Sequence, residues 1–546
     1  MLKKRFIQVA LCILLVFVFL TPLAQADLVV GNTKNWQDLY LTGFYAASLD
    51  YDYAYFTSLR DANLKTQTFP QSSNIIILEH SNDPVVRNYQ NFLRVRGYEN
   101  VESIVFSDYT ELQDILASRM DSDKALVLDS RWGMEAVAAT TFMINEGFSP
   151  YFLSEDNRNT VLSDIRGKEE VLIVGHFPVR LIADFPGNKI TDFPDFNANT
   201  MSLRSARTGD YNWGQISNSQ RQDFSTFKSR IPNFVFNGDV QRTAQTIRNS
   251  GVRNFEVIGS EMADIATNIR GASGENLRLL LKYARTYTNI DELSGQLLDL
   301  DRVEMPYPNI GLSIVNATYY PNLNTFTLTF VNTGTMDTKI FSTIEVNGQN
   351  LGDDFAHRVL ANSSFTIPYS VGDLSGAEFA ILDTIYGYAE PLQRTLSTGL
   401  TANRFPVTID KRVDDSSVEL KKALFDDDNG LFYVEVESVG TSNANVIVEV
   451  LVDESALVSK PTVISGRERV VIPAPFVEIG SVIGNSYDFN VYFGEEEIVK
   501  TSSFEDVLVE EYTSLGRVIT YFAIAILIAV LWILFFVFSK KKKKRK

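Results

Sequence analysis

The sequence predicts a multidomain fold: N-terminal α/β repeats with parallel sheets, then two all-β sandwiches, then one C-terminal transmembrane helix. Three observations predict this order. Between residues 27 and 288, short β-branched runs alternate with amphipathic stretches, which is typical of parallel strands covered by helices. After residue 309, period-two strands are separated by turn residues at roughly 10-residue intervals, as in β-sandwiches. Residues 518–538 form an uncharged run near the carboxyl end.

The first 26 residues have the features of a secretory signal peptide. Basic residues at positions 3–5 precede a mostly apolar stretch, and Ala24-Gln25-Ala26 is a cleavage pattern. An uncleaved N-terminal anchor is the alternative interpretation. Under either interpretation, we expect residues 27–517 to lie outside the cytoplasm.

The uncharged run near the carboxyl end predicts a membrane span. At about 1.5 Å rise per residue, a helix from Val518 to Phe538 is about 31 Å long, close to the roughly 30 Å hydrocarbon core of a bilayer. The basic residues from Lys540 to Lys546 follow it and indicate the cytoplasmic side. We therefore expect a single-pass protein of the cell membrane, with the lipid bilayer as a partner, a stem at 506–517 and a cytoplasmic tail at 539–546. A buried core helix is the alternative.

Composition limits the class of protein further. The only cysteine, Cys12, lies in the predicted signal, so the mature chain is expected to fold without disulfides. The formal net charge is −17, and about −27 remains for the part between the two basic ends. So acidic a surface disfavours nucleic acid as a partner.

The α/β part repeats its order of elements. The first repeat, 27–120, has expected strands at 28–30, 53–56, 74–78 and 101–106. The second, 121–190, has them at 125–128, 150–153 and 171–174, which gives a period of about 98 residues. An irregular insertion is expected at 191–230 and a third repeat at 231–288, closed by a helix at 277–287. A linker at 289–308 contains an expected helix at 293–300 and the hinge Pro306-Tyr-Pro308.

The second repeat carries a family resemblance. A strand enters the turn at Asp129, an Ala-rich helix follows at 136–139, and the run VLIVG ends at Gly175; FEVIGS echoes it at 255–260. This pattern resembles the cell wall-binding repeat type 2 family. The resemblance implies α/β repeats that attach surface proteins to wall polymers, and so an envelope polysaccharide or a surface-layer protein as partner.

The β-rich part divides into two expected sandwiches, 309–400 and 401–505. Turn signals at Asn332-Thr-Gly334 and Asn347-Gly348 separate the strands of the first. The run FTLTFVNTG at 326–334, followed by IEVNG at 344–348, resembles the adhesion-type immunoglobulin-like modules of prokaryotic surface proteins. Both sandwiches are expected to act as spacers.

Polar residues at the carboxyl ends of the parallel strands are the candidate ligand-binding residues, because such folds bind ligands at that edge. They are Asn32, His80, Asp129, Arg131, His176 and Asp239. A turn histidine bonded to backbone is the alternative for His176. No histidine pair at helical spacing and no phosphate-binding glycine loop is present, so neither a metal nor a cofactor is expected.

Three further motifs have two interpretations each. Asn316 and Asn362 begin N-x-[ST] sequons and are candidate glycosylation sites, although so short a pattern also arises by chance. The acidic turn at 426–430 is expected to be a hairpin tip rather than a calcium site. The aromatic cluster at 51–56 is expected to pack in a core rather than bind sugar.

Together these features predict a non-enzymatic, membrane-anchored surface protein. Its α/β repeats would bind envelope polymer or surface-layer protein and be held off the membrane by the sandwiches. An ectoenzyme, a hydrolase using His176 and Asp129, is the first alternative. An accessory subunit of a membrane complex is the second, although the span offers little polar surface for a partner helix.

Overall fold

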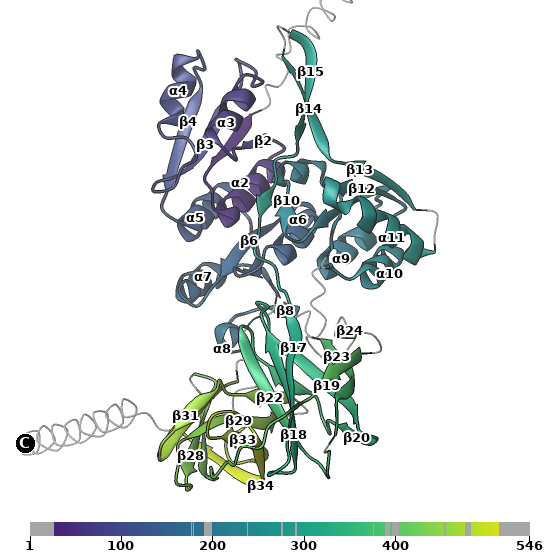
Figure 1. Cartoon of the computed structure of the whole chain (residues 1–546). Coiled ribbons are helices and arrows are strands. Elements are labelled where there is room, and N and C mark those ends of the chain that lie inside the picture. Colours follow the sequence, from purple (N-terminus) through teal and green to yellow (C-terminus); the bar gives the residue numbers. More distant parts are fainter. Residues whose placement is uncertain are drawn as a thin grey trace, which may run out of the picture. The chain divides into compact units, whose positions relative to one another are not determined.

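The computed structural model describes residues 27–512, apart from 176, 178, 191–198, 237, 275–276, 290–291, 375, 388–393, 396–402, 428, 453–454 and 475–481. The chain divides into two compact units. Unit 1 holds the described residues up to Phe177 and from Asp184 to Tyr307, and unit 2 holds those from Pro308 onward together with 178–183. Unit 1 is α/β and unit 2 is β-rich, so the predicted change from an α/β part to a β-rich part is confirmed (Figure 1).

The first sheet of unit 1 is parallel throughout, with strand order β2-β1-β3-β4. Its central strand β1 is buried along its whole length, as expected for a β-branched strand covered on both faces. The edge strand β2 is more exposed at its start. The elements are β1 (Leu28–Asn32), α2 (Trp36–Ser48), β2 (Asp52–Tyr55), α3 (Leu59–Thr66), β3 (Ile75–His80), α4 (Tyr89–Val95), β4 (Val101–Phe106) and α5 (Tyr109–Met120).

The second sheet has the equivalent order β6-β5-β7-β8, again parallel. Its central strand is also buried, which fits the apolar runs from which it was predicted. The elements are β5 (Lys124–Asp129), α6 (Met134–Glu146), β6 (Phe148–Leu153), α7 (Arg158–Ile165), β7 (Glu170–Val174), α8 (Val179–Ile182) and β8 (Asn188–Ile190).

The third sheet repeats the order once more, as β11-β9-β12-β13. Its elements are α9 (Thr200–Thr208), β9 (Trp213–Asn218), β10 (Arg221–Gln222), η1 (Phe224–Ser229), β11 (Asn233–Phe236), α10 (Val240–Ser250), β12 (Asn254–Ile258), η2 (Ser260–Met262), α11 (Ala263–Ser273) and β13 (Arg278–Lys282).

Strand β9 lies where the sequence predicted an irregular insertion, and this is a difference between expectation and structure. Hydropathy misses β9 because Gln215 and Ser217 are polar although they are buried. Ser217 donates to Asn233 Oδ1 at 2.8 Å, and Gln222 donates to Ser217 at 2.9 Å, so these side chains are hydrogen-bonded inside the sheet.

Two predicted helices are strands. In place of the helix predicted at 277–287 the chain forms β13 and the start of β14 (Ala284–Asn289). In place of the helix predicted at 293–300 it forms β15 (Glu292–Asp299), which pairs with β14 as a hairpin. Thr286 and Thr288 are β-branched and Gly295 weakens a helix, so local preference agrees with the strands. The chain then returns to the third repeat, where β16 (Val303–Glu304) pairs with β10.

The three repeats meet at Tyr40, which is fully buried on α2. Its ring lies 5.4 Å from Phe152, 6.0 Å from Phe224 and 5.4 Å from Phe227. Its hydroxyl donates to the carbonyl of Ala136 on α6 at 2.8 Å. Helices α2 and α6 and the 3-10 helix η1 follow the first strand of each repeat, so one aromatic cluster joins all three repeats into a single body.

The first module of unit 2 is a sandwich of two sheets, with orders β22-β18-β17-β26 and β20-β19-β23-β24; β21 joins β19 and β25 joins β23. Its strands are β17 (Leu312–Tyr320), β18 (Thr325–Asn332), β19 (Thr338–Val346), β20 (Gln349–Gly352), β21 (His357–Val359), β22 (Ser363–Ser370), β23 (Phe379–Gly387), β24 (Arg394–Thr395), β25 (Arg404–Pro406) and β26 (Thr408–Ile409). Alternating inward residues such as Phe326, Leu328 and Phe330 form the core.

The second module has the strand order β30-β29-β33-β34-β27-β28-β32, with β31 on β29. Strand β34 pairs with β33 as far as Leu508, with an irregularity at Asp506 (φ 54°), and pairs with β27 from Val509 onward, so it joins the two halves of the sheet. The strands are β27 (Val418–Asp426), β28 (Leu431–Ser438), β29 (Ala444–Val452), β30 (Ser455–Val458), β31 (Thr462–Ile464), β32 (Arg467–Pro473), β33 (Ser486–Gly494) and β34 (Lys500–Glu511).

The two modules share one core, and a buried charged cluster, here called the His357 joint, lies in it. Nδ1 of His357 is 3.2 Å from Glu449 and its Nε2 is 3.6 Å from Asp353. Tyr492 donates to Glu449 at 2.6 Å, and Tyr369 donates to Asp353 at 2.6 Å. Burial alone lowers the pKa of His357, but the charges of Glu449 and Asp353 outweigh it and raise the pKa to about 10. The apolar core of the first module also includes Ile447, Val458, Tyr492 and Ile498 of the second.

Within the described residues, no helix has the length and apolar character needed to cross a bilayer. The predicted span at 518–538, the basic tail and the predicted signal peptide at 1–26 all lie outside those residues.

Candidate functional site: a cleft beside strand β2

Asn32 ends strand β1 and is fully buried. Its amide nitrogen donates to Glu79 Oε2 and to the carbonyl of Val86, both at 2.7 Å. Its amide oxygen accepts from the Val86 N–H at 2.9 Å. Asn32 therefore ties the loop after β3 to the end of β1.

His80 ends the neighbouring strand β3. Its Nδ1 accepts from the backbone N–H groups of Asn82 and Asp83, at 3.2 and 3.1 Å, and its ring lies edge-on to Phe106 at 5.6 Å. The imidazole therefore closes a turn. Asn32 and His80 share the carboxyl edge of the first sheet, as predicted from the strand ends.

Asp129 and Arg131 form a bidentate pair at the end of β5. Nε of Arg131 lies 3.0 Å from Oδ1 of Asp129, and Nη2 lies 2.7 Å from Oδ2. Burial lowers the pKa of Arg131, but the Asp129 carboxylate outweighs burial and raises it. The carboxylate is engaged by Arg131, so this geometry does not resemble a catalytic base poised for a substrate.

The remaining candidates lie apart from one another. Asp239 caps α10 by accepting from the N–H of Arg242 at 3.0 Å, and His176 lies outside the described residues. Asn362 is exposed at a turn with φ 50°, while Asn316 lies in a bulge of β17 and is half-buried. The sheet edges of the repeats do not bring the candidate ligand-binding residues together, and their ligand roles stay predictions.

A cleft with a volume of about 340 Å³ lies beside the edge strand β2, and sequence reasoning missed it. It is here called the β2 cleft. It is lined by Leu28, Asp52, Tyr53, Ala54, Tyr55, Lys65, Thr68, Phe69, Pro70, Ser73, Ser225 and Asp301. Among the described strands, β2 pairs with β1 alone, so its other side faces elements from distant parts of unit 1.

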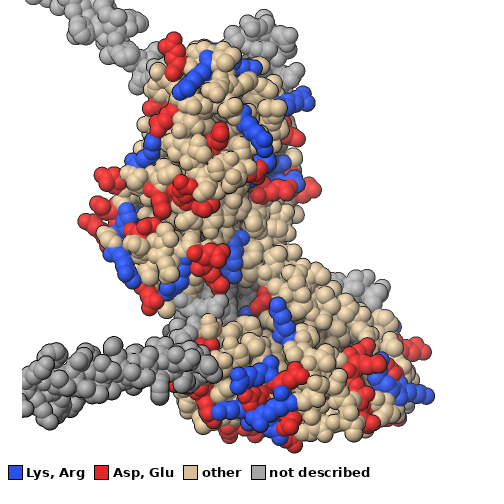
Figure 2. Space-filling model, turned by 90° about the vertical axis from the view of Figure 1, so that its left-hand side faces the viewer, with Lys and Arg blue, Asp and Glu red and all other residues tan. Residues whose placement is uncertain are grey.

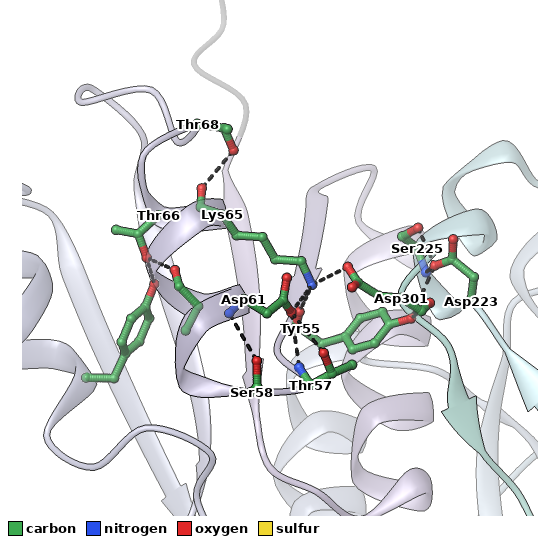
Figure 3. Close-up of polar contacts among 12 residues, drawn as sticks. Tyr55, Thr57, Ser58, Asp61, Lys65, Thr66, Thr68, Asp223, Ser225 and Asp301 are labelled. Atoms are coloured by element: carbon green, nitrogen blue, oxygen red, sulfur yellow. Dashed lines mark hydrogen bonds and ion pairs between the residues drawn. The ribbon is translucent and has the colours of Figure 1, made fainter. Parts of the chain in front are cut away.

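Lys65 provides the buried charge of the cleft (Figure 3). Its ammonium lies 2.8 Å from Asp61 and 2.5 Å from Asp301, and it donates to the carbonyl of Tyr55. It also lies 4.8 Å from the centroid of the Tyr55 ring. Lys65 is thus held by two carboxylates and a carbonyl, and it ties α3 to the segment after β15.

The tyrosines of β2 form the wall of the cleft. Tyr55 is 1% exposed, and its single O–H points between two acceptors, Asp223 at 3.3 Å and the carbonyl of Asp301 (Figure 3). Tyr53 stacks on Tyr55 with ring centroids 5.6 Å apart and is half-buried. Burial raises the pKa of Tyr53, so the phenol stays neutral and donates to the carbonyl of Leu39 at 2.8 Å.

The core interpretation of the aromatic cluster is therefore confirmed for Tyr55 and for Phe56, which is also 1% exposed. The cleft itself carried no sequence signal, because Tyr55, Ser225 and Asp301 lie far apart in the chain and meet only through the packing of the repeats. In the described part of the chain, no group of three or more His, Cys, Asp or Glu side chains is placed to hold a metal ion.

No protein-family model matches the chain, and no curated protein matches it. Among solved structures it is similar to Cwp6 from Clostridium difficile, with 14% identity over 46% of this chain and 45% of that one, at a TM-score of 0.37. It is also similar to a 1.5-MDa bacterial ice-binding adhesin, with 15% identity over 37% of this chain and 65% of that one, at a TM-score of 0.15. S. aureus TarS matches 82% of this chain and 95% of its own length at 7% identity and a TM-score of 0.14. Likenesses this low define no family.

Proposed function

We propose that the chain is a single-pass, membrane-anchored cell-surface protein whose unit 1 binds envelope polymer or surface-layer protein at the β2 cleft. The β2 cleft is the observation on which the proposal depends, because it combines a cavity, the half-buried ring of Tyr53 and polar groups in one lining. The predicted signal peptide and membrane span support placing residues 27–517 outside the cytoplasm. The acidic composition and the lack of cysteine after Cys12 agree with this.

Unit 2 suits the role of a spacer. Its two modules share a core and the His357 joint, so they are held as one body rather than as two domains on a flexible linker.

On the face shown in Figure 2, acidic and basic side chains are interspersed rather than gathered into one basic patch, in keeping with a partner other than nucleic acid.

The binding test uses the full-length chain in detergent micelles, incubated with purified envelope fragments of the source cells. A blocking variant, Ser225→Tyr, adds a ring at the exposed lip of the β2 cleft, and Ser118→Tyr on the exposed side of α5 is the matched control. We expect the blocking variant to lose at least 10-fold in bound material and the control to bind as the native chain does. Equal binding by the native chain and both variants would exclude the cleft as the binding site.

The topology test uses single cysteines, because the mature chain is predicted to have none. A cysteine at Ser118 is expected to react with a membrane-impermeant maleimide on intact cells, and one at Ser539 only after permeabilisation. The reverse pattern would overturn the proposed orientation.

A further inference from the structure

We infer that the β2 cleft recognises a primary ammonium carried on a hydroxyl-rich ring, the chemistry of an unacetylated amino sugar. This inference rests on the proposed function, since it names the class of polymer that the cleft would take. It depends on the charges of the lining, on which of them are already engaged, and on the groups that surround the remaining carboxylate.

The charge balance of the lining favours a cation. Asp52 and Asp301 are acidic and Lys65 is the only basic residue of the lining. Lys65 is already held by Asp61, Asp301 and the Tyr55 carbonyl, so its charge is engaged within the protein. An anionic sugar would therefore meet Asp52, whose counter-charge Lys228 is not part of the lining, and this disfavours phosphate or uronate groups.

Asp52 is the carboxylate that a ligand can reach. It starts β2, its side chain is 53% exposed, and it pairs with Lys228, which is 43% exposed. Ion pairs so exposed contribute little to stability, so a ligand ammonium can replace Lys228 at little cost. The ligand would then lie beside Asp52 and the half-buried ring of Tyr53.

The rest of the lining suits a sugar ring. Thr68, Ser73 and Ser225 contribute hydroxyl groups, and Phe69 contributes an apolar surface. The volume of about 340 Å³ lies at the lower end of ligand pockets, which span roughly 300–1,000 Å³. Lys65 over the ring of Tyr55 shows that this wall already accommodates an ammonium against an aromatic face.

The test measures binding of defined oligosaccharides to the full-length chain in detergent micelles by isothermal titration calorimetry. Chitosan oligomers carry primary amines, and chitin oligomers of equal length carry acetylated ones. We expect chitosan oligomers to bind at least 10-fold more tightly than chitin oligomers, and free lysine, which has an amine but no sugar ring, to bind weakly. Equal affinity for the two oligomers would overturn the inference.

Two variants separate the carboxylate from its ion pair. D52N removes the charge that would hold the ligand amine, and K228Q breaks the same Asp52–Lys228 pair but leaves the carboxylate. We expect D52N to lose about 10-fold in chitosan affinity, and K228Q to keep or gain affinity. Both residues are exposed, so folding is checked by an unchanged melting temperature. A D52N chain that binds as tightly as the native one would overturn the inference.

Failure of this inference and failure of the proposed function give different results. If envelope fragments bind to the native chain but chitosan oligomers do not compete, the ligand class is wrong and the proposed function stands. If envelope fragments do not bind at all, the proposed function fails, whatever the oligosaccharides do.

Discussion

The Lys65 cluster of unit 1 and the His357 joint of unit 2 have the same parts in different surroundings. Each places one cation between two carboxylates: Lys65 between Asp61 and Asp301, and His357 between Asp353 and Glu449. The Lys65 cluster borders an open cleft. The joint is closed by aromatic rings, with Phe355 at 4.6 Å, Phe365 at 5.8 Å and Tyr492 at 6.2 Å from the imidazole.

The difference shows what access to water does to a buried charge. Removing one member of a sealed ion pair leaves an uncompensated charge in a low dielectric, which costs several kcal/mol. Where a cleft is adjacent, water can solvate the remaining carboxylates, and the cost falls toward that of a lost hydrogen bond. The same arrangement is therefore a sealed joint in unit 2 and a water-accessible border of the β2 cleft in unit 1.

The largest effect is expected for His357→Phe. It leaves Asp353 and Glu449 buried without their cation, so unit 2 should lose about 3–5 kcal/mol of stability and its two modules should melt separately. Differential scanning calorimetry of the full chain measures both. His80→Phe at the half-exposed turn is the control and should cost under about 1 kcal/mol.

A double variant tests whether charge or shape is responsible at the joint. Replacing His357 by Phe and Glu449 by Leu removes both a charge and its partner, so we expect more than half of the lost stability to return. No recovery would mean that packing, rather than the unpaired carboxylate, sets the cost.

Lys65→Met tests the open counterpart. The stem of the side chain is kept, and water entering from the cleft can solvate Asp61 and Asp301, so we expect a loss of about 1–3 kcal/mol. Lys228→Met, at the exposed pair beside the same cleft, should change stability by under about 0.5 kcal/mol. A loss for Lys65→Met equal to that for His357→Phe would contradict the role assigned to the cleft.

Asp38 provides a buried carboxylate without a cation. It is fully buried on α2 and accepts from the Thr33 hydroxyl at 2.8 Å, while Oδ1 has no hydrogen-bond partner among the described residues. Burial raises its pKa to about 7; the Thr33 bond opposes this and the charge of Asp108 adds to it.

The sign of its pH effect follows from that shift. The unfolded chain has an ordinary Asp pKa, so the folded state is favoured below about pH 4 and loses this advantage as pH rises through 7. Asp38→Asn should remove the dependence and stabilise unit 1 by on the order of 1–2 kcal/mol at pH 8. Melting temperatures of the native chain and the variant at pH 5 and pH 8 measure this pH dependence. A variant that is destabilised at both pH values would contradict the raised pKa of Asp38.

The sequence predicted the strands that are apolar and missed those that are polar. The runs at β1 and β7 are β-branched and were placed correctly, and so was the change to period-two strands after residue 309. Strand β9 escaped because Gln215 and Ser217 are buried polar residues whose partners are on other strands. Hydrophobic periodicity identifies the buried positions of a strand only where the buried residues are apolar.

The candidate site was harder to predict than the fold. The end of a strand can be predicted from the local sequence alone, and Asn32 and His80 do lie at one edge of the first sheet. The β2 cleft depends on Asp301 meeting Lys65, which requires the docking of the third repeat and the return of the chain at β16. The His357 joint likewise links residues of two modules, and a single histidine in a β-rich sequence carries no signal of that pairing.

The smallest effect calibrates the others, because it removes a buried hydroxyl without touching a charge. Tyr40→Phe loses the hydrogen bond to the Ala136 carbonyl, which still accepts from Thr140 at 2.9 Å, so we expect a cost of about 0.5–1.5 kcal/mol. Tyr492→Phe is the matched change at the joint and takes a donor from the Glu449 carboxylate. It should cost about 1.5–3 kcal/mol, since hydrogen bonds to charged groups are stronger. Equal losses for the two variants, measured by calorimetry, would show that burial rather than charge sets the scale in both units.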